Sequence, residues 1–234
     1  MHAFVAQARA KAFKAGMTRT LLLAAALLLG SAGTAAAQDA GSGTDAAPTV
    51  VYELFTSQGC SSCPPANRQI TRIADEPGVL ALSYGVTYWD YLGWKDTFAR
   101  PEFTQRQRDY VRAMGARNAY TPQIVVNGAR HDSRIGGLEG SETLARDVSL
   151  APKGGKILAD GDGRAVLVAY TPGSQDVPVA RGENGGRTLR LTNVVTEVEE
   201  VRLPHSFTPS DGQAYALIQH GERARITSAA TWSP

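Results

Sequence analysis

The sequence predicts an α/β domain followed by a smaller β-rich module. Residues 50–55 and 79–84 are β-rich, apolar runs, and the segment between them has apolar residues at helical spacing. This order is typical of a βαβ unit with parallel strands. After Ala151-Pro152 the composition changes to short apolar runs separated by turn residues. We therefore expect the α/β domain over residues 48–150 and the β-rich module over residues 151–234.

Two prolines place the start of the first helix. Pro64 and Pro65 cannot lie deep inside a helix, so the helix begins at about Ser62 or Cys63. It ends at Gly78, before the second strand.

A second helix is expected with Pro101 in its first turn, where the missing N–H costs nothing. Residues 124–126 read as a strand that Asn127-Gly128 turns into a type I′ hairpin. The pattern then predicts a closing helix over residues 141–150, with Ser141 as its N-cap.

The β-rich module contains three further signals. Residues 160–163, Asp-Gly-Asp-Gly between two apolar runs, predict a hairpin. Over residues 188–201 the apolar positions change from odd to even, which indicates a β-bulge. Residues 214–219 and 224–229 are expected to pair as strands.

Residues 1–37 have the three parts of a secretory signal. A basic stretch ends at Arg19, an apolar core covers residues 21–29, and Ala35-Ala36-Ala37 satisfies the A-x-A cleavage rule. The core of nine residues is shorter than the ~20 that span a bilayer. An uncleaved membrane anchor is the alternative. We expect a mature chain without a membrane span, in the periplasm or outside the cell.

The charge of the chain excludes a basic nucleic-acid-binding surface. The sequence has 24 Lys and Arg and 22 Asp and Glu, but four of the basic residues and none of the acidic ones lie in residues 1–37. The predicted mature chain therefore has a net charge near −2. With two cysteines, a scaffold held by several disulfides is also excluded.

Cys60 and Cys63 are the main candidates for chemistry. A disulfide across so short a loop restricts the unfolded chain by only about 2 kcal/mol, so a structural staple would span a longer loop. The short spacing does supply a second thiol that resolves a mixed disulfide formed at the first. The helix N-terminus favours a thiolate at Cys60. An inert disulfide is the alternative.

Glu53 lies in the otherwise apolar strand that leads to the cysteines. If it points inward, partial burial raises its pKa toward the range useful for proton transfer, and it can accept the proton of Cys63. A solvent-facing strand residue is the alternative, because parity alone does not settle the face.

Thr121-Pro122 precedes the strand over residues 124–126. Pro122 has no backbone N–H to donate to a neighbouring strand in the middle of a sheet, so it lies at the start of that strand. A cis Thr121–Pro122 peptide bond is energetically accessible because residue 122 is a proline, and an ordinary trans turn is the alternative.

Three other features have open interpretations. Trp89, Tyr91 and Trp94 either line an apolar docking face or pack over the sheet. Residues 182–186 either nest an anion or form a simple turn. A metal at Cys60 and Cys63 would need a distant His or Met as a further ligand, and we expect no metal.

The sequence resembles the thioredoxin superfamily in a combination of three features. They are the strand followed by the CxxC and a helix, the X-Pro before a strand and hairpin, and Gly136-Gly137 before a helix. Residues 121–128 are similar to the cis-proline strand of glutaredoxins. Glu53 is similar to the buried acid of thioredoxins and periplasmic disulfide-forming enzymes, with one extra residue before the first cysteine.

The resemblance implies a thioredoxin-like fold, with a central mixed sheet flanked by helices and an insertion at residues 89–114. It implies that Cys60 is the nucleophile, that Cys63 is the resolving thiol, and that Pro122 is a cis proline facing them.

Three longer segments resemble a secreted bacterial family of unknown function. They are residues 53–65, 88–96 and 181–187. Gly85 and Thr87 stand where that family leads us to expect His and Asp. The match covers nearly all of the predicted mature chain and implies a fold but no substrate.

The favoured function is thiol–disulfide exchange through Cys60 and Cys63, with protein or small-molecule thiols as partners and Thr121 and Trp89 at the substrate. We expect no cofactor beyond the Cys60–Cys63 disulfide, and a redox partner that recycles it. Two alternatives remain open: a metallochaperone for a soft ion such as Cu(I), and a redox-inert binding module.

Export should remove the leader. We expect the mature N-terminus at Gln38, within a few residues, because Ala35 and Ala37 occupy the small-residue positions of the cleavage rule. Intact-mass measurement on protein from the periplasmic fraction checks this, and a retained leader in that fraction would contradict it.

Overall fold

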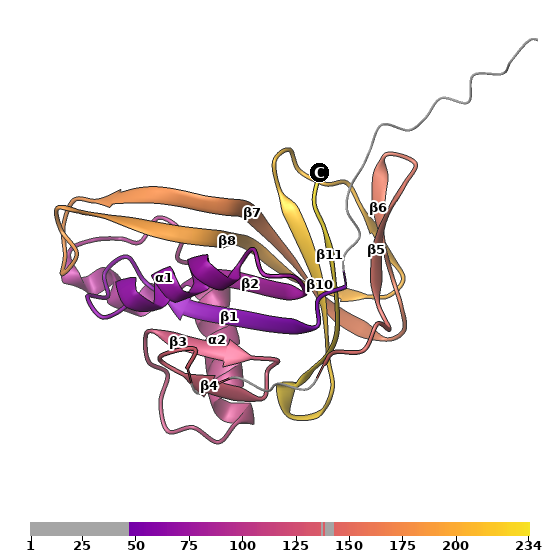
Figure 1. Ribbon diagram of the computed structural model, residues 1–234, viewed down its shortest axis with the longest axis horizontal. Coiled ribbons are helices and arrows are strands. Elements are labelled where there is room, and N and C mark those ends of the chain that lie inside the picture. Colours follow the sequence, from indigo (N-terminus) through magenta and orange to yellow (C-terminus); the bar gives the residue numbers. More distant parts are fainter. Residues whose placement is uncertain (1–46, 137, 139–142) are drawn as a thin grey trace, which may run out of the picture. The chain divides into compact units, whose positions relative to one another are not determined.

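The computed structural model describes residues 47–136, 138 and 143–234 (Figure 1). The predicted leader and its cleavage site lie outside the described residues, as do Gly137 and Ser141. In the part of the chain that is described, no helix combines the length and the apolar character needed to cross a membrane.

The elements alternate only in the first half of the chain. The strands are β1 (Val50–Thr56), β2 (Val79–Gly85), β3 (Gln123–Val126), β4 (Arg130–Asp132), β5 (Ser149–Lys153), β6 (Lys156–Asp160), β7 (Arg164–Val179), β8 (Arg187–Arg202), β9 (His205–Phe207), β10 (Ala214–His220) and β11 (Ile226–Trp232). The helices are α1 (Pro64–Ile73), α2 (Pro101–Ala113) and the short 3₁₀ helices η1 (Thr87–Leu92) and η2 (Glu222–Ala224).

A mixed sheet of eight strands is the centre of the described structure. Its order is β11-β10-β7-β8-β2-β1-β3-β4. The β1–β2 and β2–β8 pairs are parallel, which confirms the predicted βαβ unit, and the other pairs are antiparallel. β7, β8, β10 and β11 come from the predicted β-rich module, so the sheet continues across the expected boundary at residue 150.

α1 begins where the two prolines predict it. Cys63 is the N-cap, and Pro64 and Pro65 occupy the first helical positions. The helix packs on the sheet face to which Leu54 points, and Ile70 is fully buried in that contact. Burial of a side chain of this size contributes about 1.5–3 kcal/mol. The packing therefore holds the N-terminus of α1 next to the end of β1.

α2 covers the opposite face of the sheet. Phe103 and Tyr110 are buried there beside Phe55 and Tyr84, and the Tyr84 and Phe103 ring centroids are 5.6 Å apart. Successive side chains of a strand point to opposite faces. Glu53 therefore shares the α2 side with Phe55, whereas Leu54 between them faces α1.

A second sheet, in the order β5-β6-β9, packs against the C-terminal strands. Residues 160–163 form a turn, as predicted, but the predicted hairpin is wrong. β6 pairs with β5 and β9, whereas β7 pairs with β8 and β10. The turn carries the chain from one sheet to the other. Apolar runs on either side of a turn do not show whether the two strands pair with each other or belong to different sheets.

The helix predicted over residues 141–150 is also wrong in its described part. Residues 143–148 are extended or irregular, and Ser149 begins β5. Leu144 and Val148 have the spacing of neighbours on one helix face, but they are buried in different apolar clusters on the two sides of the large sheet. Tertiary contacts thus outweigh the local pattern.

Three β-structure predictions are confirmed. The β7–β8 register shifts between Thr171 and Ser174, opposite Val194 and Thr192, which is the predicted bulge. Asn127 and Gly128 have φ of 48° and 60°, the two positive values that a type I′ turn requires. β10 pairs with β11, although β11 starts only at Ile226.

Gly85 has a packing reason to be glycine. A Cβ on it would lie 2.8 Å from the backbone N of Ala99 and 2.9 Å from the carbonyl C of Phe98. Backbone atoms cannot move aside as a flexible side chain does, so this chain has no room for the His expected at this position.

Ser228 supports the extended segment before β5 and provides a test of it. Its buried hydroxyl accepts the N–H groups of Asp147 (2.9 Å) and Val148 (3.3 Å) and donates to the Ala145 carbonyl (3.0 Å). We expect Ser228→Ala to lower the free energy of unfolding by about 1–3 kcal/mol, because these groups lose their partner. Urea denaturation of the mature protein measures this.

The matched control is Ser206→Ala, on an exposed position of β9. We expect it to change stability by less than about 0.5 kcal/mol. Equal stability of wild type and Ser228→Ala would mean that the extended segment is held by other contacts.

Candidate functional site

The two cysteines form a disulfide at the N-terminus of α1. Their Cα atoms are 5.4 Å apart, and Cys63 is the N-cap of the helix. The turn is closed by the Cys63 N–H, which donates to the Cys60 carbonyl at 3.2 Å. Both cysteine side chains are fully buried. The pair is thus placed at the positive end of the helix, as the prolines predict.

Thr121-Pro122 lies beside this turn. The Thr121–Pro122 bond is cis, which confirms the expected geometry of that bond, and Pro122 is buried. The Ser62 hydroxyl lies 3.4 Å from the Cys60 Sγ and donates to the Thr121 carbonyl at 3.4 Å. Ser62 therefore links the disulfide to the segment before β3.

Trp89 is on the same side of the molecule as the disulfide. Its indole Nε1 donates to the Thr121 hydroxyl at 2.7 Å, and its Cβ would lie 3.2 Å from a Cβ on Gly59, the residue before Cys60. Trp89 is half-buried and packs against the core, whereas Tyr91 two residues later is 78% exposed. The structure thus brings together the disulfide, Thr121, Pro122 and Trp89.

Gln58 is a contact residue that sequence reasoning missed. It is buried, its backbone N–H donates to the carboxylate of Asp96 at 2.7 Å, and its side-chain oxygen accepts the indole N–H of Trp94 at 2.8 Å. Burial raises the pKa of Asp96, against the lowering effect of its backbone hydrogen bonds from Gln58 and Phe98. These contacts fix the chain two residues before Cys60.

The loop between β7 and β8 covers the other side of the turn. Asn184 is fully buried and donates to the carbonyls of Gln58 (3.0 Å) and Cys60 (2.8 Å). The exposed Glu183 accepts the N–H of Ser61, between the cysteines, at 3.1 Å. Residues 181–186 form a turn, with φ of 76° at Gly182.

The three segments that carry the resemblance in the sequence therefore meet at one place. Residues 53–65 hold the disulfide, residues 88–96 contribute Trp89, Trp94 and Asp96, and residues 181–187 contribute the covering loop. The motifs in these three segments were the signal in the sequence that could have identified Gln58, Glu183 and Asn184 as residues of the site. Spacing alone could not identify a contact between residues more than 120 positions apart in the chain.

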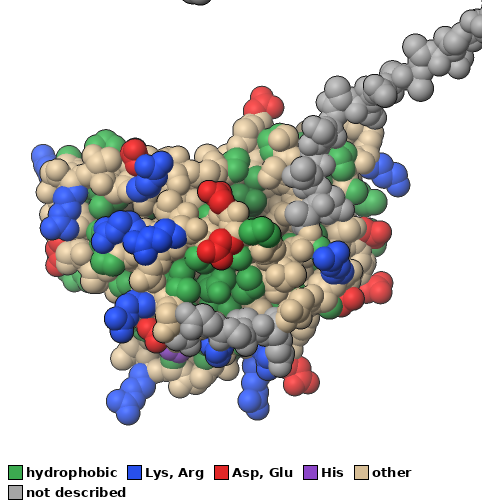
Figure 2. Space-filling view, in the orientation of Figure 1, with side chains coloured by type: hydrophobic (Ala, Val, Ile, Leu, Met, Phe, Trp, Pro, Cys, Tyr) green, Lys and Arg blue, Asp and Glu red, His purple; other side chains and the backbone are tan. Residues whose placement is uncertain are grey.

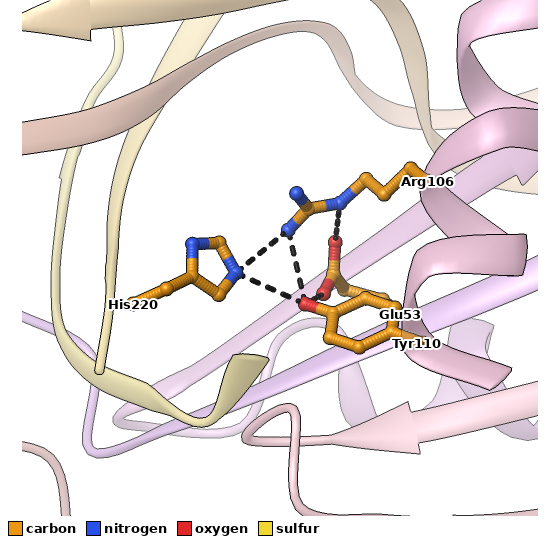
Figure 3. Close-up of polar contacts among 4 residues, drawn as sticks. All are labelled: Glu53, Arg106, Tyr110 and His220. Atoms are coloured by element: carbon orange, nitrogen blue, oxygen red, sulfur yellow. Dashed lines mark hydrogen bonds and ion pairs between the residues drawn. The ribbon is translucent and has the colours of Figure 1, made fainter. Parts of the chain in front are cut away.

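Glu53 lies away from this site. It is fully buried on the α2 face, where the Arg106 Nε donates to its Oε1 at 2.8 Å and the Tyr110 hydroxyl donates to its Oε2 (Figure 3). Burial opposes ionisation of this carboxyl, but the charge and hydrogen bonds of Arg106 and Tyr110 outweigh it and lower the pKa. The expected raised pKa is wrong, because the positive charge of Arg106 lies against the Glu53 carboxylate and not in solvent.

His220 completes the cluster on the α2 face. Its Nε2 lies 3.2 Å from the Tyr110 hydroxyl and 3.3 Å from the Arg106 Nη2 (Figure 3). Burial and the adjacent positive charge of Arg106 lower the pKa of His220 to about 4. Arg106, Tyr110 and His220 are among the residues that line an open pocket of about 440 Å³. We find no group of three or more potential metal ligands among the described residues.

This cluster makes stability depend on pH. An unfolded His has a pKa of about 6.5, so between that pH and 4 the unfolded chain binds a proton that folded His220 does not. Stability should therefore fall as the pH drops from about 6.5 toward 4, by up to about 3 kcal/mol from this residue. Glu53, whose pKa is lowered from 4.5, adds to the loss only at lower pH.

Urea denaturation at pH values from about 7.5 to 4.5 measures the effect. His220→Gln should flatten this part of the stability profile, and His205→Gln, the same substitution in β9, is the comparison variant. A profile that is the same in wild type and His220→Gln would show that His220 does not cause the pH dependence.

The family described as "Protein of unknown function (DUF1223)" matches residues 51–219, which include every segment around the disulfide. The crystal structure of protein AGR_C_4864 from Agrobacterium tumefaciens is 30% identical, with a TM-score of 0.61, over 80% of this chain and 94% of that chain. HBP35 of Porphyromonas gingivalis is 12% identical, with a TM-score of 0.48, over 79% of this chain and 74% of that chain. No curated protein matches the sequence. The chain belongs to the DUF1223 family.

Proposed function

We propose that the protein is a thiol–disulfide oxidoreductase that acts through Cys60 and Cys63. The observation that carries the proposal is the disulfide at the N-terminus of α1, with the Thr121 carbonyl linked to it through Ser62. A disulfide across this short turn adds little to stability. The helix N-terminus stabilises the thiolate that forms when the bond opens.

The same proposal includes a thioredoxin-like core. Its support is the parallel β1–α1–β2 unit followed by β3, which runs antiparallel to β1 after Thr121-Pro122 and pairs with β4. The extended residues 143–148 differ from the helix expected at the end of such a core. The strands β7, β8, β10 and β11 are then an extension of its sheet.

The reaction is an exchange of one disulfide for another. A substrate thiolate attacks the Sγ of Cys60, the Cys60–Cys63 bond breaks, and Cys63 leaves as a thiolate at the N-cap of α1. A second substrate thiol, deprotonated, then attacks the substrate sulfur of the mixed disulfide and releases Cys60. The substrate dithiol is oxidised to a disulfide, and the cysteine pair is reduced to a dithiol. The reverse sequence reduces a substrate disulfide.

Burial and neighbours suggest how a substrate reaches Cys60. Because both cysteines are buried, access to Cys60 requires its cover to move. The exposed Ser62, 3.4 Å from the Cys60 Sγ, is the residue whose displacement opens a path. Thr121 and the half-buried Trp89 would then lie against the substrate. A small thiol or an extended peptide suits such an opening better than a rigid protein surface.

The compartment is part of this proposal. The secretory signal in the sequence delivers the chain to the periplasm or the exterior, where a cysteine pair can cycle between dithiol and disulfide. A separate redox partner must return the pair to its working state.

Trapping of the mixed disulfide tests the function. With Cys63→Ser, an incoming disulfide should form a stable adduct at Cys60, because the resolving thiol is missing. With Cys60→Ser, we expect at least about a tenfold lower yield of adduct, because the path that opens when the exposed Ser62 moves leads to Cys60. Mass spectrometry of each reduced variant after mixing with a model disulfide measures the yield.

Wild-type protein should exchange with the same disulfide and return to the Cys60–Cys63 form. Adducts that form equally at both cysteines, or no exchange by reduced wild type, would contradict the proposed function.

A further inference from the structure

Two consecutive residues of the β7–β8 loop hold the CxxC turn. Asn184 is fully buried, and its amide donates to the Gln58 and Cys60 carbonyls. The Arg187 guanidinium donates to the side-chain oxygen of Asn184 at 3.1 Å, which fixes the orientation of the amide. The backbone at residue 184 is therefore anchored to the turn, and the neighbouring Glu183 is held at a defined place.

From this position, Glu183 contacts Ser61, which lies between the two cysteines. Its Oε2 accepts the backbone N–H of Ser61 at 3.1 Å. Hydrogen bonds from Ser61 lower the pKa of Glu183, so its carboxylate is ionised at neutral pH. A full negative charge thus contacts the backbone of Ser61, the residue that follows Cys60 in the sequence.

This charge acts against the chemistry of a helix N-terminus. A thiolate at Cys60 gains from free N–H groups and from the positive end of α1. Here the Ser61 N–H is already bound by a carboxylate, and a like charge disfavours ionisation of a nearby thiol. We propose, on the basis of the function proposed above, that Glu183 is a positioning residue that holds a negative charge at the CxxC turn and suppresses the Cys60 thiolate.

Other charged groups near the turn act through different contacts. Arg187 binds the side chain of Asn184, and Asp96 accepts the N–H of Gln58 from the opposite side. The first turn of α1 has no acidic residue. Figure 2 shows Lys and Arg side chains gathered on the α1 side of the molecule over the end where β7 and β8 are joined. Glu183 thus places an acidic side chain in contact with Ser61, between the two cysteines.

The consequence for the redox couple has a definite sign. A less stable thiolate makes the reduced form less favourable, so the disulfide is preferred and the pair is a stronger reductant. Removal of the Glu183 charge should shift the equilibrium toward the dithiol. The loop thus shifts the balance between oxidant and reductant through the charge of Glu183.

The test is the pKa of the Cys60 thiol in the full mature chain. The Cys63→Ser background leaves one thiol, whose ionisation is followed by the ultraviolet absorbance of the thiolate. We expect Glu183→Gln to lower the Cys60 pKa by about half a unit, a discounted value because Glu183 is exposed to solvent. The shift should shrink at about 1 M salt, because an exposed charge is screened.

Glu199→Gln is the matched control. It removes the same charge from an exposed position of β8, near the other end of the β7–β8 pair, and should leave the Cys60 pKa unchanged. With both cysteines present, Glu183→Gln should shift the equilibrium with glutathione by up to about threefold toward the reduced protein, since half a pKa unit is about a factor of three.

Asn184 provides an independent check on positioning. In an Asn184→Ala background, Glu183 loses its anchor, and Glu183→Gln should then change the Cys60 pKa by less than it does alone. Thermal unfolding of each variant confirms that the compared proteins are folded.

The outcomes separate this inference from the function itself. A Cys60 pKa that is equal in wild-type and Glu183→Gln backgrounds, or a shift that salt does not reduce, would overturn the role of Glu183 even if wild type exchanges disulfides. Absence of exchange by wild type would overturn the proposed function, whatever the pKa of Cys60.

Discussion

The short parallel contact between β2 and β8 is the interaction on which the rest of the arrangement depends. The ladder itself pairs only Ser83 with Val194, and side chains reinforce it. The Ser83 hydroxyl donates to the Thr192 carbonyl at 2.7 Å, and the Asn193 amide donates to the Ala81 carbonyl at 2.9 Å. These bonds attach the long β7–β8 pair to the sheet of the first half of the chain, and they bring the loop at its end to the disulfide.

The local elements could be predicted from the sequence because each has a local cause. Pro64 and Pro65 set the start of α1, Asn127-Gly128 sets the hairpin between β3 and β4, and the change of parity in β8 marks its bulge. The extended segment at residues 143–148 could not be predicted in this way. Leu144 and Val148 imitate a helix face, but the Leu144 N–H donates to the Thr49 carbonyl and the Val148 N–H to the Ser228 hydroxyl, both far away in the sequence.

The site was predictable in its centre and not in its surroundings. The CxxC spacing and Thr121-Pro122 identify the residues that meet, but Asn184 reaches Cys60 across 124 positions of sequence, which no local pattern records. Glu53 shows the opposite case. One extra residue separates it from the first cysteine, compared with the pattern it resembles, and in a strand one residue reverses the face. The acid therefore pairs with Arg106 below the sheet, on the side away from α1.

The sheet that crosses residue 150 has a consequence for any attempt to divide the chain there. A fragment of residues 48–150 would lose β8, and the N–H and C=O groups along the outer side of β2 would become an open edge. An apolar edge of this kind is a template for pairing with another chain and for aggregation. Ala81, Leu82 and Tyr84 of β2 are fully buried in the intact structure. The β7–β8 pair therefore covers this edge and prevents β2 from pairing with the β2 strand of another copy of the chain.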